Sequence, residues 1–241
     1  MSQTYPSSLY QMIASVEDHH FWFTARNTMI TSLIHATISS PYTSKTFLEI
    51  GCGTGIVMAT LEKLGFITTG LDVNEKALSY AAKRTHGKLI RQSIFRYTSA
   101  KRYDVVGAFD VLEHIRDDKG FLQACYRLLT VNGYLLLTVP AGRDMWSLVD
   151  TQSGHVRRYE YEELLEKLHS TGFKIVRQSY WNSLLLPFYR VWHNKKEVAA
   201  HLQKMPPIIN MVLKWLFHVE LLLSRFIRFY NGATMVVCAQ K

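Results

Sequence analysis

Three glycines at alternate positions follow a short apolar run that carries an acidic side chain. Residues 47–55 read Phe-Leu-Glu-Ile-Gly-Cys-Gly-Thr-Gly, and a segment typical of a helix comes next. Glycine lets the backbone approach a ligand closely, and the first turn of a helix offers free N–H groups to it. Asp72 lies about 20 residues further on, after a second apolar run, where a carboxylate can accept hydrogen bonds from both hydroxyls of a ribose. These residues together predict a nucleoside-binding unit.

The glycine spacing argues against two common kinds of nucleotide. A dinucleotide fingerprint requires glycine at position 56, where this chain has Ile56. A P-loop requires Gly-Lys-Ser or Gly-Lys-Thr, and the first lysine after the glycines is Lys63. The sequence therefore disfavours both NAD and a nucleoside triphosphate.

The pattern Glu-x-Gly-x-Gly-x-Gly, from Glu49 to Gly55, resembles the first motif of the class I S-adenosylmethionine-dependent methyltransferases. The resemblance implies that the glycines pass beneath the methionine part of the cofactor and that Asp72 holds its ribose. This cofactor has no diphosphate, so no lysine is needed to neutralise one. On this basis we expect S-adenosylmethionine to be bound by a set of nine residues: Glu49, Gly51, Cys52, Gly53, Asp72, Val73, Gln92, Ser93 and Asp110.

Later segments extend the resemblance over about residues 45–180 and 233–240. Residues 103–115, which include Asp-Val-Leu-Glu-His-Ile from Asp110, resemble the fourth-strand motif of small-molecule members of the family, and residues 133–140 resemble the fifth strand. The family implies that Asp110, or a neighbouring carbonyl, receives the amino group of the cofactor. One departure is the pair Gln92 and Ser93, which stands where many members place an aspartate near the adenine.

Two further segments resemble a subgroup of bacterial methyltransferases whose substrate is unassigned. These are residues 19–26 (His-His-Phe-Trp-Phe-Thr-Ala-Arg) and the region from Trp146 to Tyr159. We expect Trp22, Trp146, Arg158 and Tyr159 to contact the methyl acceptor. A bland alternative remains for Arg158, namely that it belongs to a solvated basic pair ahead of an acidic helix.

His114 and His155 are the candidate catalytic residues. Methyl transfer from a sulfonium is an in-line displacement, so the enzyme mainly aligns the reactants and excludes water. A base is needed only when the acceptor must lose a proton, and histidine suits that role at neutral pH. The alternative is structural: His114 packs its turn and His155 anchors its loop. Asp110, Glu113 and His114 also resemble a metal set, but most family members with a Leu-Glu-His-Ile run use no metal, so we expect none.

The order of apolar runs predicts the elements that position these residues. Strands are expected at about 45–50, 66–72, 88–91, 103–109, 133–139, 173–180 and 234–239, alternating with helices at 55–65, 74–84, 117–129 and 160–170. Such alternation predicts an α/β fold with a parallel, doubly wound sheet. The family resemblance implies that it is the seven-stranded, mostly parallel sheet of the Rossmann-like methyltransferase fold. Asn74 is placed to cap the second helix.

We expect a single methyltransferase domain over residues 1–241, with an N-terminal helical lid at 1–40 and a helical insertion at 183–230. The insertion is predicted as two helices, 183–203 and 207–230, separated by a Pro-Pro pair. Three interpretations remain open for it: packing on the sheet or on a second subunit, roofing an apolar pocket, or lying on a membrane. The membrane interpretation means lying on the surface, because the second of these helices matches a membrane-spanning helix poorly.

Composition narrows the partners. The 241 residues have a net charge of +9, and Lys and Arg outnumber Asp and Glu by 13 to 6 in residues 152–241. This excess lies among apolar residues and forms no nucleic-acid-binding signature, so we expect no nucleic acid and favour a small-molecule or lipid-linked acceptor, with peripheral membrane contact and homodimerisation left open. Three isolated cysteines and the absence of an N-terminal signal segment predict a cytoplasmic setting, with the inner face of a membrane as the variant.

Other functions fit the sequence less well. A nucleic-acid methyltransferase would show an Asn/Asp-Pro-Pro motif after the fourth strand, whereas this chain has Asp-Val-Leu-Glu from Asp110. A non-catalytic, cofactor-binding regulatory subunit and a protein methyltransferase remain as alternatives.

Overall fold

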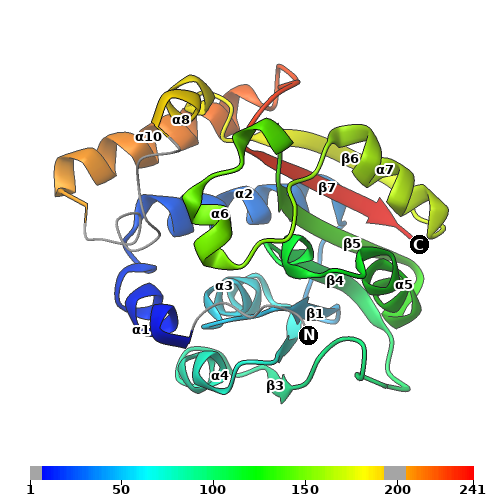
Figure 1. Cartoon of the computed structure of the whole chain (residues 1–241). Helices are drawn as coiled ribbons and strands as arrows, with labels where there is room; N and C mark the ends of the chain where they lie inside the picture. Colours follow the sequence, from blue (N-terminus) through cyan, green and yellow to red (C-terminus); the bar gives the residue numbers. More distant parts are fainter. Residues whose placement is uncertain (1–6, 193–204) are drawn as a thin grey trace.

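A seven-stranded sheet forms the centre of the molecule in the computed structural model, which describes residues 7–192 and 205–241 (Figure 1). The strand order is β3-β2-β1-β4-β5-β7-β6. The strands are β1 (Thr46–Ile50), β2 (Ile67–Asp72), β3 (Lys88–Arg91), β4 (Tyr103–Phe109), β5 (Leu129–Pro140), β6 (Lys174–Trp181) and β7 (Thr234–Gln240).

The first five strands pair in parallel, and β7 runs antiparallel between β5 and β6. The prediction of a mostly parallel, doubly wound sheet is therefore confirmed. The sequence of β4 is apolar without alternation because both faces of this strand are covered. Residues 105–109 are all buried. β5 begins four residues earlier than predicted because the chain enters the sheet directly after the preceding helix.

Helices cover both faces of the sheet. They are α1 (Ser7–Val16), α2 (Phe21–Thr37), α3 (Ile56–Leu64), α4 (Glu75–Ala81), α5 (Asp118–Leu128), α6 (Leu148–Ser153), α7 (Tyr161–Ser170), α8 (Leu186–Trp192) and α10 (Pro207–Leu223), with short 3-10 turns η1 (Leu112–His114) and η2 (Arg143–Met145). α5 and α7 contribute Phe121 and Leu164 to the core on one face, whereas α2, α3 and α10 contribute Ile34, Leu61 and Phe217 to the core on the other. Asn74 caps α4 as predicted, since its side-chain oxygen accepts from the Ala77 N–H.

The helix α6 was not predicted, because its stability does not come from apolar periodicity. It is only six residues long and begins with a capping box, in which Ser147 and Asp150 satisfy each other's backbone and side-chain groups. Such local hydrogen bonding leaves little trace in the hydropathy pattern.

The insertion before β7 differs from its predicted boundaries. α8 is a short helix that begins at Leu186, and residues 193–204, the rest of the first predicted helix, lie outside the described residues. α10 ends at Leu223 rather than at 230. A helix persists where it packs an apolar face, and residues 225–228 are all exposed, so nothing supports further turns. No described helix has both the length and the apolar character that crossing a bilayer would require.

Candidate active site

A cavity of about 440 Å³ opens at the carboxyl ends of β1, β2 and β4. Parallel sheets bind ligands at this edge, where the strand order reverses direction between β1 and β4. The predicted cofactor residues from Glu49 to Asp110 all line it, as do His114, His155, Arg158 and Trp22. Residues 10–26 of the first two helices close its opposite side.

The glycine turn is shaped by positive φ angles and by Asp72. Gly51, Gly53 and Gly55 have φ values of 70°, 54° and 79°, which glycine adopts readily. A side chain at Gly51 would collide with Val111, because an added Cβ would lie 2.5 Å from its Cγ2 atom. The Gly53 N–H donates to Asp72 Oδ2 at 2.8 Å. The turn and the end of β2 are therefore fixed to each other.

Asp72 is oriented by backbone groups on both of its oxygens. Gly53 donates to Oδ2 and Asn74 N–H donates to Oδ1, each at 2.8 Å. Burial raises the pKa of Asp72 above its ordinary value, while the backbone hydrogen bonds partly offset that rise. Each carboxylate oxygen keeps a lone pair that can accept from a ribose hydroxyl.

Glu49 lies at the floor of the cavity as a buried carboxyl group. Its Oε2 atom has no hydrogen-bond partner among the described residues. Burial raises the pKa of Glu49 to about 8, against the opposing attraction of the Arg26 guanidinium. A group with this pKa changes charge readily when a cation approaches it.

Arg26 is a site residue that the sequence analysis did not single out. Its Nη1 atom donates to Asp110 Oδ2 at 2.9 Å, and both side chains are largely buried beside the cavity. Asp110 has a φ of 57°, and Thr138 holds it through three hydrogen bonds. The Asp110 N–H donates to both the carbonyl and the hydroxyl oxygen of Thr138, and the Thr138 hydroxyl donates to Oδ1 at 2.9 Å. The only sequence signal for Arg26 was its place in the 19–26 segment.

The connection between α1 and α2 is tied to the glycine turn by an ionic cluster with a buried centre. Thr54 donates its hydroxyl proton to Glu17 Oε2 at 2.6 Å, and Arg84 forms an ion pair with the other oxygen of Glu17. A second nitrogen of Arg84 lies 3.0 Å from Asp18. Glu17 is 1% exposed, so this cluster holds α1 against the cavity through buried groups.

The two candidate histidines meet edge to face, with ring centroids 4.8 Å apart. His114 Nδ1 lies 3.2 Å from the Gly154 carbonyl oxygen, and His155 Nδ1 lies 2.7 Å from Asp150 Oδ1. Burial, followed by the neighbouring His155, lowers the pKa of His114 to about 4. His114 is therefore neutral at pH 7 and weakly basic, whereas His155 has a carboxylate behind it.

Asp150 is the group that organises His155 and Arg158. Burial alone would raise the pKa of Asp150, but the hydrogen bonds from His155 and Arg158 outweigh it and hold that pKa below its usual range. Arg158 donates to both oxygens of Asp150, at 2.9 and 3.0 Å, and to the Ala141 carbonyl. Its guanidinium is thus already engaged, which leaves it little capacity to bind an acidic acceptor.

Two of the predicted acceptor residues are not brought to the cavity. Tyr159 is fully buried, its hydroxyl donates to Asp118 Oδ2 at 3.1 Å, and burial raises its pKa above the ordinary range. Trp146 is 38% exposed and donates to Thr151, while its neighbours Met145 and Ser147 line the cavity instead. Met145 and Ser147 therefore replace Trp146 in the acceptor hypothesis, and Tyr159 is dropped from it. Trp22 does line the cavity, and its ring lies 5.0 Å from that of Trp181.

Glu113, His114 and His155 could together hold a metal ion. One ligand atom from each lies within 4.8 Å of the others. This set differs from the one considered from the sequence, since His155 stands in place of Asp110. Both carboxyl oxygens of Glu113 are buried without a hydrogen-bond partner among the described residues, and burial raises its pKa well above the usual value. The expectation that no metal is used stays a prediction.

Comparison with known proteins decides the family. A family model for a methyltransferase domain matches residues 21–178. The chain belongs to this methyltransferase family. The match begins at α2 and includes the glycine turn, Asp72, Asp110 and both histidines, so it covers most of the site built above.

Named relatives of this methyltransferase fall into the same class. A ubiquinone biosynthesis O-methyltransferase of Histophilus somni is 31% identical over 121 residues, covering 44% of this chain and 50% of that protein. A probable S-adenosylmethionine-dependent methyltransferase of Mycolicibacterium smegmatis is 26% identical over 175 residues, covering 68% of this chain and 63% of that protein. The chain thus spans about half the length of the first of these relatives.

A solved structure shows the same fold. Magnesium protoporphyrin IX methyltransferase from Synechocystis, with bound S-adenosylmethionine, aligns with a TM-score of 0.56 and 14% identity, covering 91% of this chain and 81% of that one. At that identity the likeness establishes the architecture alone. Together with the family match, it confirms the predicted methyltransferase family and its Rossmann-like fold.

Proposed function

We propose that this methyltransferase transfers the methyl group of S-adenosylmethionine to a hydroxyl of a small molecule with an apolar body. The observation that carries the proposal is the convergence, in one cavity, of charged groups that match each part of this cofactor. Asp72 stands on the ribose side, and the Arg26–Asp110 pair stands across the glycine turn from it.

The cofactor's amino-acid end is a zwitterion, and the site offers both complementary charges. Arg26 would hold the carboxylate, and Asp110 with Glu49 would receive the ammonium group. Gln92 and Ser93 line the same cavity beyond Asp72 and can hydrogen-bond the adenine edge.

His155 would act as the general base. An alcohol or phenol must lose its proton as the methyl group is transferred, and a histidine held by a carboxylate is suited to accept it. Asp150 holds the Nδ1 side of His155, and Nε2, which lies 3.8 Å from Glu113 Oε1, is the nitrogen left to accept the proton. The low basicity of His114 favours a positioning role for it.

The acceptor's body would lie against apolar walls. Trp22, Ile115, Met145 and Val149 line the cavity on the histidine side. Relatives are named as ubiquinone biosynthesis O-methyltransferases, which supports a phenolic, lipid-linked acceptor for this chain as well. Apolar walls around the reacting centre also exclude water.

Two measurements test the proposal. Calorimetry on the purified protein should show binding of S-adenosylmethionine and S-adenosylhomocysteine and no response to NAD. Methyl transfer from labelled cofactor should then be measured over paired phenols with and without a prenyl tail. Binding of NAD alone would defeat the proposal, and cofactor binding without transfer to any phenol would favour the regulatory-subunit alternative.

A further inference from the structure

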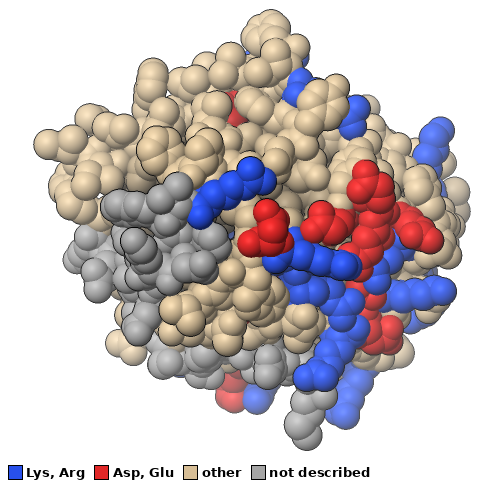
Figure 2. Space-filling view, turned by 45° about the horizontal axis from the view of Figure 1, so that its top comes forward, with Lys and Arg blue, Asp and Glu red and all other residues tan. Residues whose placement is uncertain are grey.

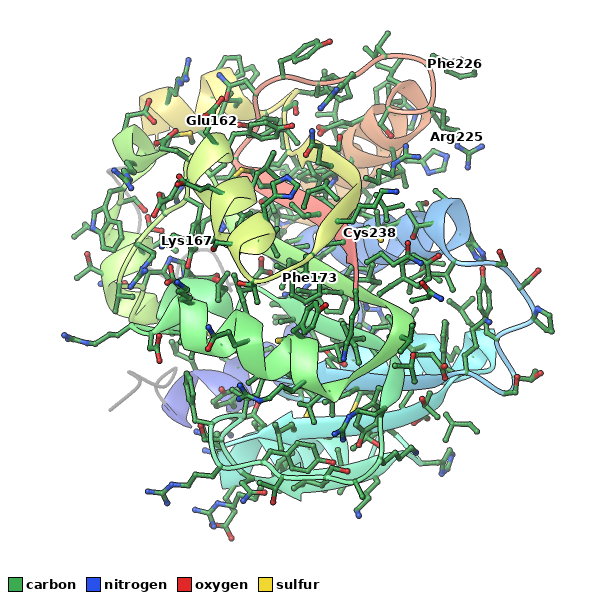
Figure 3. All side chains as sticks on the ribbon, turned by 90° about the vertical axis from the view of Figure 1, so that its right-hand side faces the viewer. Glu162, Lys167, Phe173, Arg225, Phe226 and Cys238 are labelled. Atoms are coloured by element: carbon green, nitrogen blue, oxygen red, sulfur yellow. The ribbon has the colours of Figure 1, made fainter. Side chains whose placement is uncertain are left out.

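The outer surface of α10 and the turn after it is unusually apolar. We call this surface the apolar ridge; it consists of the exposed residues Ile208, Ile209, Met211, Val212, Trp215, Leu222, Leu223, Phe226, Ile227 and Tyr230. Ile208 is 72% exposed, Trp215 62% and Phe226 86%. Figure 3 shows the Phe226 side chain projecting away from the ribbon, beside that of Arg225. Large contiguous apolar surfaces mark contact sites.

The ridge is not needed to hold α10 in place. The inner side of this helix already packs through Phe217, which is buried against Phe21 and Trp181. It is also fixed by Glu220, whose carboxylate accepts from the backbone N–H groups of Ser183 and Leu184. The apolar residues on the outer side therefore serve something outside the described fold.

The charges along the ridge have one sign at its surface. Between residues 205 and 231 the basic residues are Lys214, Arg225 and Arg228, and the single acidic residue is Glu220, which is 1% exposed. In Figure 2 the upper part of the visible face is mostly tan, and side chains of both charges gather at the lower right. Within this segment the charges that reach the surface are thus cationic, which complements an anionic lipid surface.

We propose that the apolar ridge docks on the surface of an anionic lipid bilayer, with α10 lying in the interface rather than crossing it. None of the described helices could span a bilayer. A second copy of the chain fits the ridge less well, because within residues 205–231 it would offer Arg225 and Arg228 no exposed acidic partner. Lipid headgroups would neutralise these same side chains, while Trp215 and Phe226 enter the acyl boundary.

Docking at the ridge would place lipid close to the cavity. The side chain of Asn210 on α10 accepts from the Phe21 N–H at 2.7 Å and donates to the His19 carbonyl at 2.8 Å. Phe21 and Trp22 line the cavity, so α10 is joined directly to its wall. Delivery of a lipid-linked acceptor along this route rests on the proposed function, whereas docking itself does not.

Vesicle co-sedimentation of the full chain tests docking without any activity assay. Phosphatidylcholine vesicles are compared with vesicles of phosphatidylcholine mixed with phosphatidylglycerol, across a salt series. We expect binding to the mixed vesicles that weakens as salt rises, since screening reduces the attraction of the basic residues. No binding to the mixed vesicles, or equal binding to both kinds without salt dependence, would overturn the proposal.

Matched variants locate the docking surface. Trp215→Glu and Phe226→Glu should each weaken partitioning of the protein onto the mixed vesicles by about tenfold or more. Each variant removes a large apolar group and adds a negative charge that the anionic lipids repel. Val131→Glu is the control, since Val131 is 82% exposed at the start of β5, outside the ridge. Circular dichroism and the melting temperature confirm folding of each variant. Equal loss in the control, or a dimer in light scattering that Trp215→Glu dissociates without any vesicle binding, would assign the ridge to another occupant.

Discussion

At the scale of single residues, the carboxylate of Asp72 has two roles. It holds the glycine turn through Gly53 and is expected to hold the ribose. Asp72→Ala should weaken S-adenosylmethionine binding by about 1.5–3 kcal/mol, the range of charge-assisted hydrogen bonds. Calorimetry measures the change. Glu75→Ala, at the exposed start of the next helix, is the control and should bind normally; equal affinities for both variants would place the ribose elsewhere.

Glu49 should make the affinity for S-adenosylmethionine depend on pH. Its pKa of about 8 means that the carboxyl group is mostly protonated at neutral pH and becomes charged as pH rises through that value. A cationic cofactor favours the charged form, so affinity for S-adenosylmethionine should rise as pH approaches about 8 and then level off. Calorimetry in buffers of different ionisation enthalpy should detect proton release on binding. Glu49→Gln should abolish that release, and release that persists in this variant would point to another group.

The two histidines should differ in catalytic effect. His155→Ala should reduce turnover by about 10²–10⁴-fold with cofactor affinity almost unchanged, because it removes the proposed base. His114→Ala should cost less, since the low pKa of His114 makes it a poor base at neutral pH. Turnover and KM measured for both variants decide the roles. A larger loss for His114→Ala would reverse the assignment, and a raised KM with little change in kcat would mark His155 as a positioning residue.

Sequence reasoning found the residues whose role is local and missed those whose role is made by contacts. The glycines and Asp72 can be recognised from their spacing along the chain, because they lie in neighbouring turns that follow consecutive strands. Arg26 acquires its role only by meeting Asp110, which is 84 positions away in the chain. Tyr159 illustrates the opposite error, because nothing in its surrounding sequence tells that its hydroxyl turns inward to Asp118.

At the scale of elements, the sheet was predictable and the short or exposed helices were less so. Strands such as β4 are continuous buried runs, which single sequences reveal well. α6 depends on the capping box of Ser147 and Asp150, and the end of α10 depends on where burial stops rather than on where apolar residues stop. Hydropathy shows where the apolar residues of α10 stop, but it does not show where burial stops.

The attachment of α1 is the element-scale feature open to test. Arg84→Met should loosen α1, because it leaves the buried Glu17 carboxylate without its cationic partner, a loss of about 3–5 kcal/mol when such a pair is broken. We expect faster cleavage in limited proteolysis between α1 and α2 and faster cofactor release. Lys83→Met is the neighbouring control. Equal proteolysis of both variants would mean that the ionic cluster does not hold α1 in place.

At the scale of the whole molecule, the cavity lies where the sheet topology places ligands. β1 and β4 lead their connections to opposite sides, and the site opens between them. The family match ends at residue 178, so the insertion from 183 to 230 lies beyond it. The apolar ridge therefore had no counterpart in the resemblance and could be recognised only as an exposed surface once the inner face of α10 was accounted for.

The pairing of β6 with β7 has a consequence for how such a chain can change. Trp181, the last residue of β6, lies opposite Thr234, the first residue of β7. The 52 residues between them in the chain, 182–233, therefore leave the sheet and rejoin it at one pair of neighbouring residues. A chimaera that exchanged this excursion for that of another family member would keep every strand in register, and with them the groups around the glycine turn. Docking by the apolar ridge, as proposed above, could thus be inherited separately from the chemistry at the glycine turn.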